Sequence, residues 1–223
     1  MRFLALILIG LLAAMPLPAE QNVNPGINRN YQNPNVTQWR GMLERDGREV
    51  WDYRSEIIRH LRLRPGLVVA DIGSGTGFFT ALMARETLPG GRVYAVDIAP
   101  IFVEASVQRA RDRGMRNVVG VVNDQHSVRL PENSVDLAFI SDTYHHFEYP
   151  LSTLRSIHRA LKPGGELVVI DFKRIPGVSG PWVMNHIRAG EPEVRAEIET
   201  AGFELSERLD FMRTQYYLRF RRK

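Results

Sequence analysis

The residues most able to do chemistry lie in one short segment behind an apolar run. Residues 67–70 read Leu-Val-Val-Ala and lead to Asp71, and glycines follow at every second position, Gly73, Gly75 and Gly77, before a helix-like pattern opens. Glycines let a backbone turn sharply and approach a ligand closely, and the free N–H groups of a helix start favour an anionic group. A tight turn without a ligand is the alternative. The pattern favours a buried strand that turns into a helix beside a nucleotide-like ligand.

The glycine spacing distinguishes between classes of nucleotide. A dinucleotide turn reads G-x-G-x-x-G, with an acid roughly 20 residues further on. This chain has G-x-G-x-G behind Asp71, without a glycine at the third dinucleotide position. A second predicted strand, residues 92–96, leads to Asp97, whose carboxylate can accept hydrogen bonds from both hydroxyls of a ribose. A nicotinamide-dependent oxidoreductase is therefore the disfavoured alternative.

The pattern D-x-G-x-G-x-G, followed by a strand that ends in an acid, resembles motif I and its successor in class I S-adenosylmethionine-dependent methyltransferases. The resemblance runs in order along the chain from about Arg64 to Phe172. It includes the apolar strand at 118–122, the lead-in and strand at 130–140, and the Leu-Lys-Pro-Gly-Gly turn at 161–165. The chain looks like the broad branch of small-molecule methyltransferases that includes the ubiquinone/menaquinone enzymes.

The resemblance implies S-adenosylmethionine as the cofactor and a small molecule as the methyl acceptor. It places the glycine turn against the methionine part of the cofactor and Asp124 at the adenine amino group. The cofactor-binding residues that it implies are Asp71, Gly73, Gly75, Gly77, Asp97, Ile98, Asp124, Gln125, Ser141 and Tyr144.

A second group of candidate residues follows the fourth predicted strand. Residues 141–147 read Ser-Asp-Thr-Tyr-His-His-Phe, at the carboxyl edge where open α/β sheets bind ligands. Methyl transfer from a sulfonium requires a positioned nucleophile and removal of its proton. His145 or His146 could be the base and Tyr144 could line the methyl donor, with His146 the weaker candidate because Phe147 suggests a turn into the core. Alternatively, the two histidines only cap and pack a helix.

The sequence predicts no metal site. Asp142 and Asp171 lie at predicted strand ends, and His126 and His186 are near them in the topology. However, Phe172 stands where an amide or acid would help to hold magnesium. The chain has no cysteine, which excludes thiolate-bound zinc and iron–sulfur clusters, and with them radical use of S-adenosylmethionine.

The candidate residues follow several different strands. They can form one site only if the fold brings the ends of these strands together at one edge of a sheet. Strands and helices alternate from residue 67 onward, which predicts a parallel sheet with helices on both faces. The expected strands are 67–71, 92–97, 118–122, 135–140, 166–172, 203–211 and 215–220, and the expected helices are 77–87, 100–113, 150–161 and 192–201. The predicted fold class is α/β, a Rossmann-like doubly wound seven-stranded sheet, mostly parallel, whose last strand the resemblance implies to be antiparallel.

The first residues predict export. Arg2 precedes an apolar run at 3–12 and small residues up to Ala19, which is typical of a secretory signal peptide, with an uncleaved anchor as the alternative. We expect an exported protein, in the periplasm or cell envelope. The chain thus divides into a signal peptide at 1–19, an N-terminal arm and helical extension at 20–63 that packs on the sheet or covers the pocket, and a methyltransferase domain at 64–223.

Export raises a difficulty, because the methyl donor is made in the cytoplasm. A non-catalytic exported protein that binds an adenosine-like ligand is therefore a further alternative. The net charge of +4 comes from a local basic end, since residues 211–223 hold five basic residues and no acid. Nucleic-acid binding calls for a broader basic stripe. We expect no nucleic-acid partner and at most weak contact with an anionic membrane surface.

Overall fold

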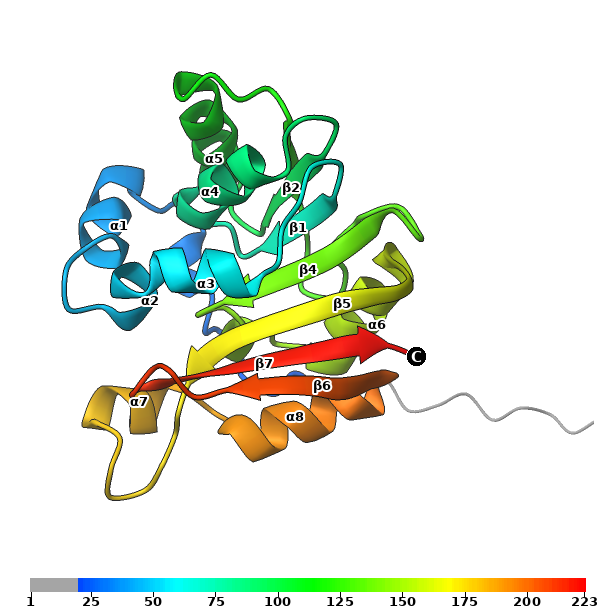
Figure 1. Cartoon of the computed structure of the whole chain (residues 1–223). Coiled ribbons are helices and arrows are strands. Elements are labelled where there is room, and N and C mark those ends of the chain that lie inside the picture. The colour runs from blue at the N-terminus through cyan, green and yellow to red at the C-terminus, as the bar shows by residue number, and fades with distance from the viewer. Residues whose placement is uncertain (1–19) are drawn as a thin grey trace, which may run out of the picture.

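Seven strands form one sheet through the centre of the molecule (Figure 1). The computed structural model describes residues 20–223, and the predicted signal peptide at 1–19 lies outside the described residues. The strands are β1 Val68–Ile72, β2 Arg92–Asp97, β3 Val118–Val122, β4 Val135–Ser141, β5 Leu161–Phe172, β6 Phe203–Leu209 and β7 Gln215–Arg222. Their order is β3-β2-β1-β4-β5-β7-β6, and β7 runs antiparallel to both of its neighbours while the other pairs are parallel. The predicted sheet is confirmed.

Helices lie on both faces of this sheet, as predicted. Those before β1 are the 3₁₀ turn η1 Arg29–Tyr31 and the helices α1 Val36–Leu43, α2 Glu49–Asp52 and α3 Arg54–His60. Those that follow are α4 Phe78–Glu86, α5 Pro100–Asp112, the 3₁₀ turn η2 Tyr144–His146, α6 Pro150–Ala160, α7 Pro181–His186 and α8 Glu191–Thr200. Among residues 20–223, no helix combines the length and the apolarity needed to cross a bilayer.

The core consists of two apolar layers, one on each face of the sheet. Side chains alternate between the faces of a strand, so adjacent residues of β1 enter different layers. Val69 belongs to the same buried cluster as Met83 of α4, whereas Ala70 belongs to the cluster of Leu154 in α6 and Ile198 in α8. Because both faces are covered, the parallel strands are almost continuously apolar.

The observed elements differ from the predicted ones mainly at β5, in the N-terminal extension and at α7, which is not among the expected helices. β5 begins at Leu161 rather than at residue 166, because Leu161 pairs with Val135 ahead of a register shift in β4. The predicted helical extension is interrupted around Gly47 and again at Tyr53, which divides it into α1, α2 and α3.

The turn after β1 is fixed to the neighbouring strand and helix. The N–H groups of Gly73 and Ser74 donate to the carbonyl oxygen of Val96 in β2, at 2.8 and 3.0 Å. Gly77 caps the start of α4 with a φ of 72°, and a Cβ there would lie 2.5 Å from the Cα of Ser106 in α5. Gly77 therefore allows α4 and α5 to approach closely.

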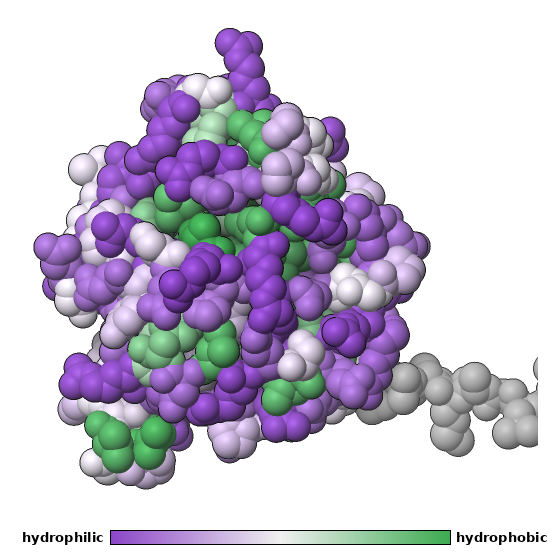
Figure 2. Space-filling view, viewed as in Figure 1, coloured by the Kyte–Doolittle hydropathy of each residue, from purple (hydrophilic) through white to green (hydrophobic). Residues whose placement is uncertain are grey.

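One face of the molecule is mainly polar, with an apolar patch at the lower left of Figure 2. This patch lies over the segment that joins β5 to α7, where Ile175, Val178 and Trp182 are exposed.

We predict that Gly77→Ala lowers the free energy of unfolding by about 2–5 kcal/mol. The left-handed backbone costs a residue with a Cβ about 1–2 kcal/mol, and overpacking against α5 adds about 1–3 kcal/mol. Gly114→Ala is the matched control, because Gly114 has a φ of 78° but no atom within 4 Å of the added Cβ. Gly114→Ala should lower the free energy of unfolding only by the cost of the left-handed backbone, about 1–2 kcal/mol. Equal losses in urea unfolding would contradict the close approach at Gly77.

Candidate functional site

The candidate site lies where the strand order reverses, between β1 and β4, with β2 and β3 on one side and β5 on the other. In open α/β sheets, ligands bind outside the carboxyl ends of the strands at this point. A cavity of about 130 Å³ opens there. Seven of the residues predicted to bind the cofactor line it, namely Gly73, Gly75, Asp97, Ile98, Asp124, Gln125 and Ser141.

Asp97 at the end of β2 is the central carboxylate of this cavity, and its side chain is only 6% exposed. One carboxylate oxygen accepts from the N–H of Gly75 and the other from the N–H of Ala99, both at 2.9 Å. Each oxygen has a second acceptor position. Burial raises the pKa of Asp97 to about 6, although the backbone donors oppose this. The geometry leaves one acceptor position on each oxygen for a pair of ribose hydroxyls.

Two further features of the wall fit a ligand that approaches the backbone closely. A Cβ built on Gly75 has no neighbour nearer than 3.9 Å, so the space beside this glycine is open. The hydroxyl oxygen of Ser141 is buried at the cavity wall and has no hydrogen-bond partner among the described residues. Buried polar groups are normally paired. A polar ligand in the cavity would supply the partner for Ser141.

Asp71 lies behind the glycine turn rather than in the main cavity. It lines a neighbouring cavity of about 50 Å³ that shares Gly73 and Gly75 with the main one. Its side chain is 3% exposed and accepts a hydrogen bond from the hydroxyl of Thr80. Burial, opposed by Thr80 and reinforced by the nearby Asp97 charge, raises the pKa of Asp71 to about 7.

Asp124 reaches the cavity from the loop after β3, but local groups already occupy its oxygens. One oxygen accepts from the N–H groups of His126 and Ser127 at 2.8 and 2.9 Å, and the other pairs with Arg129 at 3.0 Å from its Nε. These donors outweigh the effect of burial and lower the pKa of Asp124. The carboxylate is thus held ionised, with little acceptor capacity left for an adenine amino group.

Two of the predicted cofactor-binding residues, Gly77 and Tyr144, line neither cavity. Gly77 faces Ser106 of α5. The Tyr144 ring is fully buried, and its hydroxyl donates to a carboxylate oxygen of Glu197 in α8 at 2.7 Å. Tyr144 therefore points into the layer of α6 and α8, and the expected contact with the methyl donor is not present.

The two predicted catalytic histidines occupy different positions. His146 lines the cavity with Phe147, and the Nε2 of His146 lies 3.3 Å from the hydroxyl of Tyr31. Burial and the neighbouring histidines lower the pKa of His146 to about 2. His145 is buried behind it, with its Nδ1 2.8 Å from a carboxylate oxygen of Asp171. His146 lines the cavity, although Phe147 suggested a turn into the core, and its low pKa makes it a weak base.

The N-terminal extension supplies one wall of the cavity. Contacts between residues that are distant in sequence hold this wall in place. Five of its residues line the cavity: Asn28, Tyr31, Trp39, Leu43 and Arg48. The rings of Tyr31 and Trp39 stack with centroids 4.9 Å apart, and Trp39 packs edge-on against Phe102 of α5. The helix-like spacing of apolar residues indicated that this segment packs on the domain, but nothing in the sequence identified these particular side chains as cavity residues.

Several polar contacts hold this extension in place. The carboxylate of Glu20 accepts from the first N–H groups of α6, those of Leu151 and Ser152, both at 2.7 Å. Arg48 forms an ion pair with Asp142 at the end of β4. These contacts hold the extension against the start of α6 and the segment after β4.

The raised pKa of Asp71 predicts a specific pH dependence of stability. The folded state keeps a proton on Asp71 up to about pH 7, whereas an ordinary aspartate loses it near 3.8. Stability from this group is thus fully present below about pH 4 and is lost as pH rises toward 7. Relative to Asp71→Asn, the wild-type protein should lose up to about 1.4 kcal/mol of unfolding free energy per pH unit in this window. If the free energy of urea unfolding changes with pH in the same way for the wild type and Asp71→Asn, the raised pKa of Asp71 is contradicted.

Part of the chain is similar in sequence to known proteins. Residues 70–169 match the family model of the methyltransferase domain. The chain is 33% identical over 114 residues to the ubiquinone/menaquinone biosynthesis C-methyltransferase UbiE of Hydrogenovibrio crunogenus, a match that covers 51% of this chain and 45% of that protein. The chain spans about half the length of the curated relatives it matches.

Solved structures share the fold. An S-adenosylmethionine-dependent methyltransferase from Aquifex aeolicus superimposes with a TM-score of 0.74 at 24% identity, covering 85% of this chain and 99% of that one. A possible exported protein from Bordetella parapertussis gives 0.65 at 20% identity, covering 86% and 80%. At such identities the likeness concerns the fold alone. Residues 70–169 thus match a methyltransferase domain in sequence, and the cavity lies at the switch point of the fold that they share with these structures.

Proposed function

We propose that the whole chain transfers a methyl group from S-adenosylmethionine to a small molecule. The observation that carries this proposal is the buried Asp97 carboxylate, which spans the glycine turn and the end of β2 while keeping an acceptor position on each oxygen. The matching relative from Hydrogenovibrio crunogenus is a C-methyltransferase of quinone biosynthesis, which supports a small-molecule acceptor.

The residues present fit the cofactor part by part. Asp97 would hold the ribose hydroxyls, and the open backbone at Gly75 would lie against the methionine part. Ile98 and Gln125 line the part of the cavity nearest the end of β3, where the adenine would lie, and Ser141 offers its unpartnered hydroxyl. The bound cofactor supplies an electrophilic methyl group on a sulfonium.

The remaining work of the protein is to orient the acceptor and to exclude water. Tyr31 and Trp39 place two stacked aromatic rings on the wall that faces the strand ends. Correct orientation of two reactants accounts for a large part of such a rate enhancement, and an apolar wall strengthens the electrostatic contacts made inside it. The narrow, enclosed cavity favours a small acceptor over a nucleic acid, which is consistent with the absence of a broad basic stripe in the sequence.

A non-catalytic adenosine-binding protein and a nicotinamide-dependent oxidoreductase are the two alternatives, and they make different predictions about binding. Calorimetric titration of the full-length chain with S-adenosylmethionine, S-adenosylhomocysteine and NAD separates them. We expect binding of the first two and none of NAD. Binding without methylation of any component of a small-molecule extract would favour a non-catalytic adenosine-binding protein, and binding of NAD alone would favour an oxidoreductase.

We also propose that the protein is exported, with weak contact at most with a membrane surface. The charged start, apolar run and small residues at 1–19 support a signal peptide, and the possible exported protein from Bordetella parapertussis has the same fold. The exposed apolar side chains at Ile175, Val178 and Trp182 are too few for firm membrane binding. N-terminal sequencing of protein from the envelope fraction should return a start near Glu20, and recovery of intact Met1 from the cytoplasm would contradict export.

We predict that Asp97→Asn weakens S-adenosylmethionine binding by about 1.5–3 kcal/mol, or roughly 10- to 150-fold in Kd. The amide keeps the shape of the side chain but replaces one acceptor oxygen and removes the charge that strengthens these hydrogen bonds. Asp112→Asn, at the exposed C-terminal end of α5, is the matched control and should leave Kd unchanged. An unchanged Kd for Asp97→Asn in a folded protein would rule out this carboxylate as the ribose contact.

A further inference from the structure

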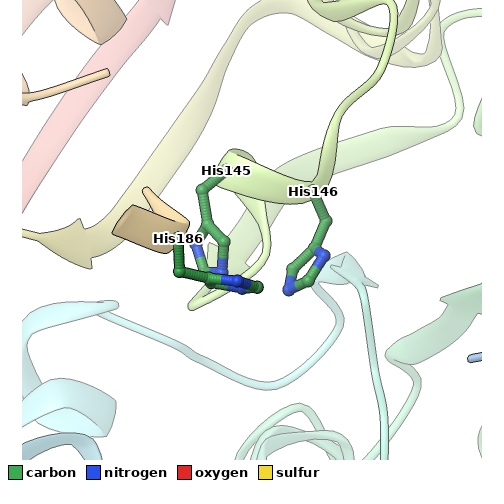
Figure 3. A group of neighbouring side chains, drawn as sticks. All are labelled: His145, His146 and His186. Atoms are coloured by element: carbon green, nitrogen blue, oxygen red, sulfur yellow. The ribbon is translucent and has the colours of Figure 1, made fainter. Parts of the chain in front are cut away.

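Three histidines converge at the edge of the cavity, and the proposed methyl transfer assigns no role to them. His145 and His146 extend from η2, and His186 reaches the same point from α7 (Figure 3). One ring nitrogen from each lies within 4.8 Å of the others. His145 is buried and the other two are half-buried, so the cluster lies at the boundary between the core and the cavity.

The carboxylate of Asp171 fixes the orientation of one of these rings. Its two oxygens lie 2.8 and 3.0 Å from the Nδ1 of His145, and one of them also accepts from the backbone N–H of His145 at 3.1 Å. Asp171 is itself 1% exposed. With Nδ1 held, the Nε2 of His145 is the nitrogen free to face the other two imidazoles. A carboxylate behind a histidine is the usual support for a histidine that binds a metal.

The other two imidazoles lack comparable partners. The Nδ1 of His146 is buried without a hydrogen-bond partner among the described residues. His186 stacks on Trp182 with ring centroids 4.8 Å apart and meets both His145 and His146 edge-on, at 5.3 and 5.4 Å.

We propose that His145, His146 and His186 bind one Zn²⁺-like cation at the edge of the cavity. Zinc–nitrogen bonds of about 2.0–2.1 Å in a tetrahedron place the nitrogens roughly 3.4 Å apart, so closure shortens the separations by up to about 1.4 Å, within the reach of side-chain rotation. Three nitrogen donors select a borderline cation such as Zn²⁺ over Mg²⁺ or Ca²⁺, which prefer oxygen.

Three protein ligands leave the fourth coordination position open, as in catalytic zinc sites. Because His146 lines the cavity, this position lies beside the cavity and would take water or an oxygen or nitrogen donor from a small molecule. The site differs from the carboxylate site that the sequence disfavoured, since its ligands are imidazoles and Asp171 supports one of them from behind. The proposal does not depend on methyl transfer, because it concerns cation binding by the protein alone.

We predict that the full-length chain, without a polyhistidine tag and freed of metal by a chelator, binds one Zn²⁺ in competition with a chromophoric chelator. His186→Phe should weaken Zn²⁺ binding at least 100-fold, because it removes one ligand while keeping an aromatic ring to stack on Trp182. Asp171→Asn should weaken it about 10- to 100-fold. His126→Ala is the matched control, because His126 is exposed and stacks on Tyr149 outside the cluster, and it should leave the affinity within twofold.

Co²⁺ gives a spectroscopic readout that a purely structural role does not produce. The wild-type protein should show the visible absorption bands of a four- or five-coordinate nitrogen site, and His186→Phe should lose them while its circular dichroism stays unchanged. Mg²⁺ should not compete. Equal Zn²⁺ affinity and equal Co²⁺ spectra for the wild type and His186→Phe would overturn the proposal and leave the histidines as an aromatic packing cluster.

Discussion

The carboxylate of Asp97 joins the two turns on which the site is built. It accepts from the N–H of Gly75 in the turn after β1 and from the N–H of Ala99 at the start of α5. The first turn leaves the sheet at the point where the strand order reverses, and the second leaves from the adjacent strand β2. A buried carboxylate that is only partly satisfied by the backbone is costly, as its raised pKa shows, and a ligand with two hydroxyls would complete it. The cavity thus combines a frame held by backbone hydrogen bonds with a carboxylate, Asp97, that keeps free acceptor positions.

The N-terminal extension completes this frame from the opposite side. Glu44, directly after α1, accepts from the hydroxyl of Thr76 in the glycine turn at 2.7 Å and pairs with Arg109 of α5. Arg48 pairs with Asp142 after β4. Because these contacts reach the elements after both β1 and β4, residues 20–63 act as part of the site rather than as an appendage. The same segment brings Tyr31 next to His146, and so connects the cavity to the histidine cluster.

The sequence was sufficient to predict most of the sheet because the first four strands contain short apolar runs bounded by turn residues, and Asp71 and Asp97 follow directly from such runs. Local pattern could not show where Tyr144 points, since its contact with Glu197 spans 53 positions. Nor could it show that Gly77 serves packing against Ser106, because glycine spacing is the same for packing and for binding. The cavity residues of the extension and the approach of His186 to His145 and His146 depend on the folded topology, which composition and periodicity do not encode.

A crystal structure of the protein with S-adenosylhomocysteine is the most direct test of the central role of Asp97. We expect both ribose hydroxyls within hydrogen-bond distance of its two carboxylate oxygens, with the bonds from Gly75 and Ala99 retained. We also expect Tyr31 and Trp39 to stay on the cavity wall. A ligand bound elsewhere, or bound here with its ribose turned away from Asp97, would contradict this account of the site.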